Sequence, residues 1–248
     1  MNEPILKVEN LVQVYGEGTP FEKVAVNNMS FELYENEFLG VIGQTGSGKS
    51  TLIQMLNGLM KPTSGKILFR GEDIWAKRYD RRLLRSKVGL VFQYPEYQLF
   101  EVTVEKDIAF GPRNMGLSEE EIADRVSEAM RLTGLSDSLR EKSPFELSGG
   151  QKRRVAIAGI LAMRPRVLIL DEPTRGIDVG AKYEIYKLIH QLAEQGKAVI
   201  LVSSELPELL GMADRIYTIF EGTITGELLA SEANQEALMK KMTITSNS

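Results

Sequence analysis

The chain has 248 residues, enough for one large domain or two closely joined lobes with a sizeable core. Hydrophobic residues make up 43% of it and charged residues 26%, which is ordinary for a globular protein. Its net charge of -4 gives no general reason to bind nucleic acid or an anionic membrane surface. The absence of cysteine excludes disulfides and thiolate metal sites and suits a cytosolic protein.

Neither a membrane span nor a secretion signal is visible in the sequence. The longest apolar run, Val155 to Met163, lies between arginines and falls short of the ~18 residues needed to cross a bilayer. The first four positions lack a basic region followed by an apolar one. We therefore expect any membrane role to come through a partner.

The first forty residues have the pattern of short strands. Residues 5–8 have the composition of a short strand, residues 16–20 are rich in turn formers, and residues 29–33 alternate between apolar and polar side chains. This pattern predicts an antiparallel start to the fold.

A glycine-rich segment at residues 43–50 matches the pattern GxxxxGK[ST]. It follows an apolar run and precedes a helix-forming stretch, the strand–loop–helix context of a phosphate-binding P-loop. Glycine lets backbone N–H groups approach phosphate, and the following helix adds its positive dipole end. We expect Lys49 to reach the β- and γ-phosphates and the Ser50 hydroxyl to take a Mg²⁺ position. A flexible turn is the alternative, which the flanking segments argue against. The predicted nucleotide-binding residues here are Gly43, Gln44, Thr45, Gly46, Ser47, Gly48, Lys49, Ser50 and Thr51.

Periodic patterns continue beyond this loop. Residues 66–71 have the pattern of another strand after a turn. From Ser118 to Leu135 apolar residues recur at helical spacing, with Ser118 as the N-cap. Residues 167–170 and 198–202 are continuous apolar runs, which are typical of buried parallel strands, and residues 181–194 fit a crossover helix between them. The second half is therefore predicted to be α/β.

Two adjacent carboxylates, Asp171 and Glu172, follow the apolar run 167–170. The carboxyl ends of strands are where open α/β sheets collect ligands. In a P-loop enzyme we expect Asp171 to hold Mg²⁺, directly or through water, and Glu172 to polarise the attacking water. A solvated Asp–Glu pair after a core strand is the alternative, which the presence of a P-loop disfavours.

A second glycine turn, Leu147-Ser148-Gly149-Gly150-Gln151, precedes another helical stretch. It has a hydroxyl at a helix N-terminus and can bind phosphate through backbone N–H groups. A helix cap without a ligand is the alternative. Taken with the P-loop, Gln93 and Asp171-Glu172, this pentapeptide makes nearly the whole chain resemble an ATP-binding cassette, the ATPase subunit of ABC transporters.

That resemblance implies an α/β P-loop NTPase fold with a RecA-like core, an N-terminal antiparallel β subdomain and a helical subdomain that carries the signature. The implied organisation is a single nucleotide-binding domain over residues 1–248. Its catalytic core and antiparallel subdomain would span residues 1–90 and 155–242, its helical subdomain residues 91–154, and a loose tail residues 243–248.

The resemblance also implies roles for individual residues. Tyr15 would stack on adenine, although a strand aromatic would look similar. Gln93 would sense the γ-phosphate, ligate Mg²⁺ and sense a transmembrane partner. Asp178 would communicate between sites across a dimer. The signature residues Ser148, Gly149, Gly150 and Gln151 would face the P-loop of a second subunit, so one chain would be half of two ATP sites.

The partners implied are a second ABC cassette, in a homodimer or a heterodimer, and membrane proteins. Residues 5–170 look like the second of the two cassettes of energy-coupling-factor (ECF) transporters, carried by segments 18–22, 43–54, 92–100 and 108–112. That family takes up vitamins and some metal ions with a transmembrane coupling protein and a small substrate-binding membrane subunit. The implied location is the cytoplasmic face of the cell membrane. The aromatic-rich segment 94–100 would be the docking site, although a loop anchored by buried aromatics would look similar.

From Asp171 onward the resemblance changes. Residues 171–186 and 203–217 look like the second cassette of a simple-sugar importer ATPase. An ECF cassette would have a histidine near Ser204, whereas the only histidine here, His190, is placed on the crossover helix. The hypothesis is that two cassette lineages, or a deliberate recombination, meet near residues 170–174.

A serine at this position bears on the rate of hydrolysis. Ser204 can donate a short hydrogen bond, but it cannot carry a positive charge or span the distance that imidazole spans. Losing such a donor at the γ-phosphate would cost ~10²-fold or more in rate. The leading expectation is a motor ATPase for an importer. The alternatives are a sugar-importer cassette, a hydrolysis-impaired regulatory half-site or a recombined chain without a cellular substrate. A soluble ABC protein acting on DNA or ribosomes is a further alternative, which the lack of a long inserted coiled coil or a basic extension disfavours.

Overall fold

A computed structural model describes residues 3–242, and two compact units are distinguished by their internal contacts. The first consists of residues 1–84 and 193–248, and the second of residues 85–192. The predicted tail after residue 243 lies outside the described residues. The predicted subdomain boundaries at residues 90 and 154 stay a prediction.

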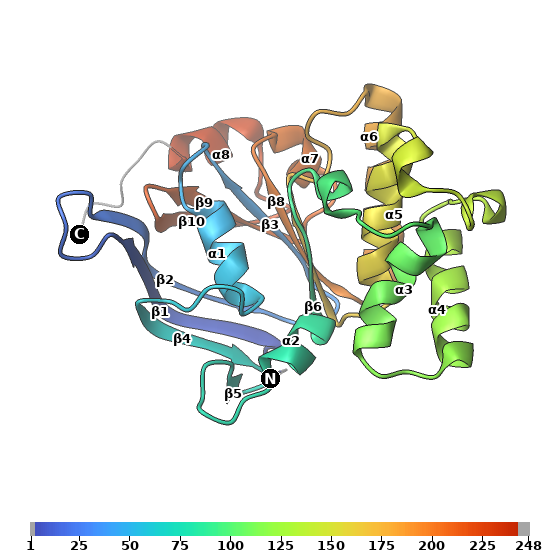
Figure 1. The fold of residues 1–248 in the computed structure, drawn as a ribbon. Helices are drawn as coiled ribbons and strands as arrows, with labels where there is room; N and C mark the ends of the chain where they lie inside the picture. Colours follow the sequence, from blue (N-terminus) through green and yellow to red (C-terminus); the bar gives the residue numbers. More distant parts are fainter. Residues whose placement is uncertain (1–2, 243–248) are drawn as a thin grey trace. The chain divides into compact units, whose positions relative to one another are not determined.

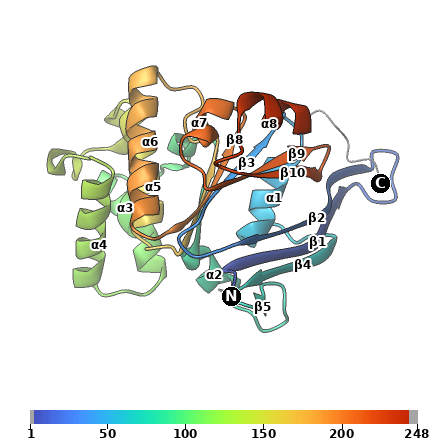
Figure 2. The same cartoon turned by 180° about the vertical axis from the view of Figure 1, so that it is seen from behind.

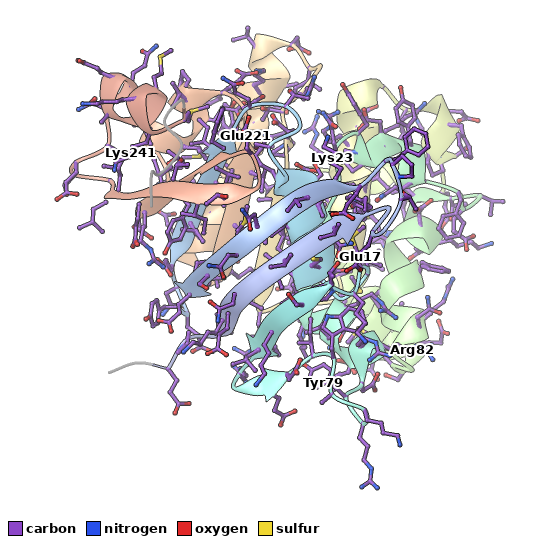
Figure 3. All side chains as sticks on the ribbon, turned by 90° about the vertical axis from the view of Figure 1, so that its left-hand side faces the viewer. Glu17, Lys23, Tyr79, Arg82, Glu221 and Lys241 are labelled. Carbon is purple, nitrogen blue, oxygen red and sulfur yellow. The ribbon has the colours of Figure 1, made fainter. Side chains whose placement is uncertain are left out.

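The first unit begins with an antiparallel sheet, as the sequence predicts. Its strand order is β2-β1-β4-β5, from the strands β1 (Leu6–Tyr15), β2 (Lys23–Leu33), β4 (Ser64–Phe69) and β5 (Glu72–Asp73). Strand β1 alternates between buried and more exposed positions because one face packs inward. Figure 3 shows the side chains around this sheet, with Glu17 and Lys23 at the connection between β1 and β2.

The same unit contains a group of strands in the order β10-β9-β3-β8. These are β3 (Phe38–Gly43), β8 (Ala198–Ser203), β9 (Arg215–Phe220) and β10 (Thr223–Leu229). Strand β3 lies between β8 and β9 and is parallel to both. All residues of β3 and β8 are buried, which is why each reads as a continuous apolar run. The helices here are α1 (Lys49–Leu56), α2 (Arg81–Lys87, which crosses the unit boundary), α7 (Leu206–Leu210) and α8 (Gln235–Lys241). Figure 2 shows α7 and α8 beside these strands.

The second unit combines two parallel strands with a set of helices. Strand β6 (Val88–Val91) pairs in parallel with β7 (Val167–Asp171). Helices α3 (Val104–Asn114), α4 (Glu119–Leu132) and α5 (Gly149–Leu161) pack on one another, as Figure 1 shows in green and yellow. Helix α6 (Val179–Glu194) follows β7, and the short 3₁₀ turns are η1 (Pro95–Gln98), η2 (Asp137–Leu139) and η3 (Pro144–Glu146).

Several local predictions are confirmed. The Ser118 hydroxyl accepts from the backbone N–H of Glu121 at 3.2 Å, which makes Ser118 the N-cap of α4. The predicted crossover helix is α6, which begins two residues earlier than expected, where Asp178 accepts from the N–H of Ala181 at 3.0 Å. The two apolar runs predicted to be buried parallel strands are β7 and β8.

Candidate functional site: a phosphate loop and a carboxylate strand end

The glycine-rich loop leaves β3 and enters α1 in the first unit, as predicted. Gly46 and Gly48 have φ values of 84° and 101°, a region that favours glycine. A Cβ on Gly48 would lie 2.2 Å from the carbonyl oxygen of Ala25, so this position admits no side chain. Gly48 is the N-cap of α1, and as a glycine it has no side chain that could cap the first N–H groups of the helix. The loop therefore presents the positive end of the helix dipole without a capping side chain.

Lys49 is folded back over this loop. Its Nζ donates to the carbonyl oxygens of Gly43 at 2.6 Å and Gln44 at 2.9 Å. The residue is only 7% exposed, so its ammonium group is buried and held at the start of the loop. The Ser47 hydroxyl is buried and has no hydrogen-bond partner among residues 3–242. A cation, an open hydroxyl and left-handed glycines on one loop fit a bound phosphate group.

The first unit brings two more predicted residues to the same loop. Ser203 is paired with Ile42 in the β3–β8 ladder, so Ser204 follows β8 at the sheet edge where the loop begins. Ser204 is exposed. The Tyr15 hydroxyl lies 3.3 Å from the Thr51 hydroxyl and donates to the Met60 sulfur at 3.4 Å. The half-exposed ring of Tyr15 therefore stands beside the start of α1, and its stacking on adenine stays a prediction.

The second unit holds the carboxylates and Gln93. Val91 pairs with Leu170 in the β6–β7 ladder, so Gln93 and Asp171 lie at the same ends of neighbouring strands. Asp171 is 5% exposed and Glu172 is 7% exposed, which does not fit a solvated surface pair. Glu172 has a φ of 47°, an uncommon conformation for a residue with a side chain and one that often marks functional sites.

The oxygen donors predicted for Mg²⁺ have the right chemistry. The carboxylate of Asp171, the amide oxygen of Gln93 and the hydroxyl of Ser50 are all hard ligands of the kind that Mg²⁺ prefers. The two donors of the second unit follow paired strand ends. The third donor, Ser50, lies in the first turn of α1. These residues fit the ion by chemistry.

The signature pentapeptide forms a complete helix cap. The Ser148 hydroxyl accepts from the N–H of Gln151 at 3.3 Å, and the Gln151 side chain accepts from the N–H of Ser148 at 3.1 Å. The pentapeptide therefore caps α5, and this cap is compatible both with a bound phosphate and with a helix end without a ligand. Among residues 3–242, no atom apart from the chain neighbours and the backbone of α5 itself lies within 4 Å of where a Cβ would stand on Gly149 or Gly150. The pentapeptide therefore keeps an open backbone face, and its contact with a nucleotide stays a prediction.

Sequence reasoning missed the residues that hold the segments around this site in place. Arg153 on α5 is 1% exposed and binds Glu96 through Nε at 3.0 Å and Nη2 at 2.8 Å. Its Nη1 donates to the carbonyl oxygens of Pro173 and Arg175, each at 3.1 Å. The spacing of Arg153 with the buried residues Ile157 and Leu161 was the available signal, since it places the arginine on the inner face of α5.

The aromatic-rich segment has exposed rings and is held by a half-buried carboxylate. Tyr97 is 84% exposed and Phe100 is 57% exposed. The Phe100 ring meets that of Phe110 edge to face at 4.9 Å. Asp107 accepts from the N–H groups of Phe100 at 3.0 Å and Glu101 at 2.9 Å. Burial raises the pKa of Asp107, and these two hydrogen bonds oppose the increase.

The comparison with known proteins follows these motifs. Residues 26–175 match the family described as ABC transporter. The chain belongs to this family. The fold of the cassette is therefore the α/β ABC ATPase fold, with an antiparallel β part and a helical part, and its enzyme class is that of the ABC-type ATPases. None of the helices formed by residues 3–242 combines the length and apolar character that crossing a bilayer requires.

The cassette is similar to ECF proteins over most of its length. The energy-coupling factor transporter ATP-binding protein EcfA2 of Caldanaerobacter subterraneus is 57% identical over 220 residues, covering 88% of this chain and 77% of that protein. EcfA2 of Bacillus subtilis is 49% identical over 209 residues, covering 83% and 76%. A match of 220 residues is longer than the segment 5–170, so it continues past Asp171. These relatives give no support to a sugar-importer segment or to a hybrid chain.

Solved structures agree in fold. The structure of cbiO1 from Clostridium perfringens, part of the ABC transporter complex cbiONQ, has a TM-score of 0.83 and 38% identity, covering 97% of this chain and 93% of that one. The ATP-binding cassette MJ0796, a dimer in a post-hydrolysis state bound to ADP and Pi, has a TM-score of 0.80 and 28% identity, covering 91% and 98%.

Proposed function

We propose that the cassette binds and hydrolyses ATP to drive substrate import through membrane proteins of the ECF type. The observation that carries the nucleotide role is the glycine loop with Lys49 buried at its mouth. The similarity to EcfA2 proteins supports the importer role. The transported substrate is bound by another subunit, so the cassette does not specify it.

The proposed roles follow from the chemistry of each group. The ammonium of Lys49 and the N–H groups of the loop bind the β- and γ-phosphates. Tyr15 stacks on the adenine ring. Ser50, Gln93 and Asp171 hold Mg²⁺, which when bound neutralises charge on the phosphate oxygens.

Glu172 is proposed to polarise the attacking water. Its side chain is nearly buried, and it follows a strand whose residues are all buried, so it is supported by a rigid element. A carboxylate positioned in this way acts as a general base for a water in line with the γ-phosphate. Gln93 and Ser204 complete the proposed catalytic set.

A second cassette, identical or related, is proposed to complete each ATP site. The glycines in the first turn of α5 support this arrangement, because the first N–H groups of a helix have no intrahelical acceptor and glycine adds no side chain that would cover them. The dimeric state of MJ0796 with ADP and Pi is consistent with it. The transmembrane coupling protein is proposed to dock on the exposed rings of segment 94–100 and to hold the cassette at the cytoplasmic face of the membrane beside the substrate-binding subunit.

Hydrolysis is proposed to be slow because Ser204 stands beside the loop where the resemblance implies a histidine. The neighbouring Ser203 hydroxyl donates to the carboxylate of Glu208, which is buried. Ser204→His would supply a longer donor at the γ-phosphate. We expect this variant to hydrolyse ATP ~10²-fold faster at saturating Mg²⁺-ATP, with unchanged nucleotide affinity. Equal rates in the two proteins would contradict the role of Ser204, while failure of both to bind ATP would contradict the nucleotide site itself.

Two finer hypotheses stay open to test. Separate comparison of residues 5–170 and 171–242 with both transporter families tests the sugar-importer resemblance of the second segment. Measurement of the ATPase rate of the assembled membrane complex tests whether the cassette is a motor or a hydrolysis-impaired half-site.

A further inference from the structure

Gln93 and Arg175 are joined side chain to side chain in the second unit. With the Gln93 amide oriented so that its oxygen faces the guanidinium, that oxygen accepts from Arg175 Nη1 at 3.0 Å and from Nε at 3.2 Å. The opposite orientation would place an NH₂ group against the guanidinium donors, with no acceptor between them. An amide oxygen has two lone pairs, and the arginine fork engages both of them.

Arg175 is held in place through its backbone. Its N–H donates to the carbonyl oxygen of Glu172 at 3.1 Å, and its own carbonyl oxygen accepts from the buried Arg153 at 3.1 Å. Arg153 also binds Glu96, three residues after Gln93. The backbone of Arg175 is thus fixed to the same helix that fixes the segment carrying Gln93.

The oxygen engaged by this fork is the one that the proposed function assigns to Mg²⁺, and the inference rests on that assignment. Both lone pairs of the Gln93 oxygen point at a guanidinium, so they are not available to a cation. We propose that Arg175 is a positioning residue that holds Gln93 away from the metal, so that binding of Mg²⁺-nucleotide requires the fork to open.

This arrangement makes the metal-competent form a minor one. When only a fraction of the molecules has a free Gln93 oxygen, the apparent metal affinity falls by that fraction. Charge-assisted hydrogen bonds at an exposed arginine shift such an equilibrium by about three- to tenfold. Removing the Arg175 side chain therefore lowers the Mg²⁺ concentration at half-saturation by about that factor, because the Gln93 oxygen can no longer be occupied by hydrogen bonds from Arg175.

A structural role alone would give a different result. Arg175 is exposed and Gln93 is partly exposed, so truncation at Arg175 leaves both groups accessible to water. We expect Arg175→Ala to keep the melting temperature of the parent. Arg164→Ala is a matched control, since Arg164 is also an exposed arginine, paired with Glu128 at 2.7 Å.

The test is equilibrium binding of a fluorescent, non-hydrolysable ATP analogue to the full chain, in EDTA and during a Mg²⁺ titration. The variants are Arg175→Ala, Gln93→Ala, their double variant and Arg164→Ala. We expect Arg175→Ala to lower half-saturating Mg²⁺ three- to tenfold with unchanged affinity in EDTA, and Arg164→Ala to match the parent. In the Gln93→Ala background, Arg175→Ala should have no effect.

The outcomes separate the two levels of the proposal. If Gln93→Ala raises half-saturating Mg²⁺ while Arg175→Ala leaves it unchanged, the positioning role of Arg175 is wrong and the metal role of Gln93 stands. An equal shift in the Gln93→Ala background would reduce Arg175 to simple charge repulsion and overturn the inference. If Gln93→Ala leaves half-saturating Mg²⁺ unchanged, the proposed metal role of Gln93 is wrong, and the inference that rests on it is wrong as well.

Discussion

The ion pair between Arg153 and Glu96 lies inside the second unit, and Glu96→Gln tests how much it stabilises the fold. The exchange keeps the size of the side chain and removes its charge. It leaves the guanidinium buried, with its side chain 2% exposed, and places an NH₂ group where the second carboxylate oxygen accepted. The carbonyl oxygens of Pro173 and Arg175 remain as acceptors, but they carry no full charge.

The size of the effect follows from the burial of the pair. Removing one partner of a buried ion pair costs about 3 to 5 kcal/mol, because the other charge stays uncompensated. Glu96 retains 17% exposure of its side chain, so we expect the lower end, about 3 kcal/mol. For a chain of this size that corresponds to a fall in melting temperature of roughly 6 to 12 °C.

The assay is chemical and thermal unfolding followed by far-ultraviolet circular dichroism. Glu128→Gln provides the control, because it makes the same exchange at the Arg164–Glu128 pair, whose side chains are 51% and 41% exposed. Exposed pairs contribute at most about 1 kcal/mol. Equal losses for the two variants would refute the reasoning. So would full additivity of Glu96→Gln and Arg153→Met, since contacting residues that share an ion pair must couple.

Two further predictions concern the first unit. Gly48→Ala would place a methyl group 2.2 Å from the oxygen of Ala25 at a φ of 101°, so we expect the loop to shift and ATP affinity to fall at least about tenfold. Gly71 has a φ of 82°, and among the described residues no atom other than its chain neighbours lies within 4 Å of where its Cβ would stand. The control variant Gly71→Ala should therefore bind ATP normally. Burial raises the pKa of Tyr217 to about 12, while an unfolded tyrosine titrates near 10, so its stabilising contribution is complete below about pH 10 and is lost as the pH rises toward 12. Tyr217→Phe should therefore lose less stability than the parent in urea unfolding between those pH values, and an equal loss would contradict this assignment.

The strands and the phosphate loop could be predicted because their signals are local. Strands β7 and β8 are buried on both faces, and each therefore reads as a continuous apolar run. The P-loop motif contains glycine where the backbone needs a positive φ, as at Gly48. For the turn at Ser148, the sequence allows either a phosphate-binding site or a helix cap without a ligand. The structure shows the cap, and phosphate binding stays a prediction.

The residues that hold the site in place could not be predicted because their partners are remote in sequence. Arg153 has apolar-face spacing on α5, but a charged side chain argues against burial unless its partner is known. That partner, Glu96, lies 57 positions away in the chain. Likewise, nothing in the sequence near Gln93 indicates that its amide meets Arg175. Pairings of this kind depend on the tertiary arrangement of α5 and the segments after β6 and β7.

The conformation of Glu172 shows what these remote pairings accomplish. A non-glycine residue in the left-handed region persists only where the surrounding structure determines it. At Glu172, the preceding strand is buried throughout, and the following turn is closed by the N–H of Arg175 on the Glu172 carbonyl. The same Arg175 is fixed by Arg153 from the helix that begins at the signature. The orientation of Glu172, the proposed base, therefore depends on α5. A displacement of α5 would shift Arg175, and through Arg175 it would change the positions of Glu172 and Gln93.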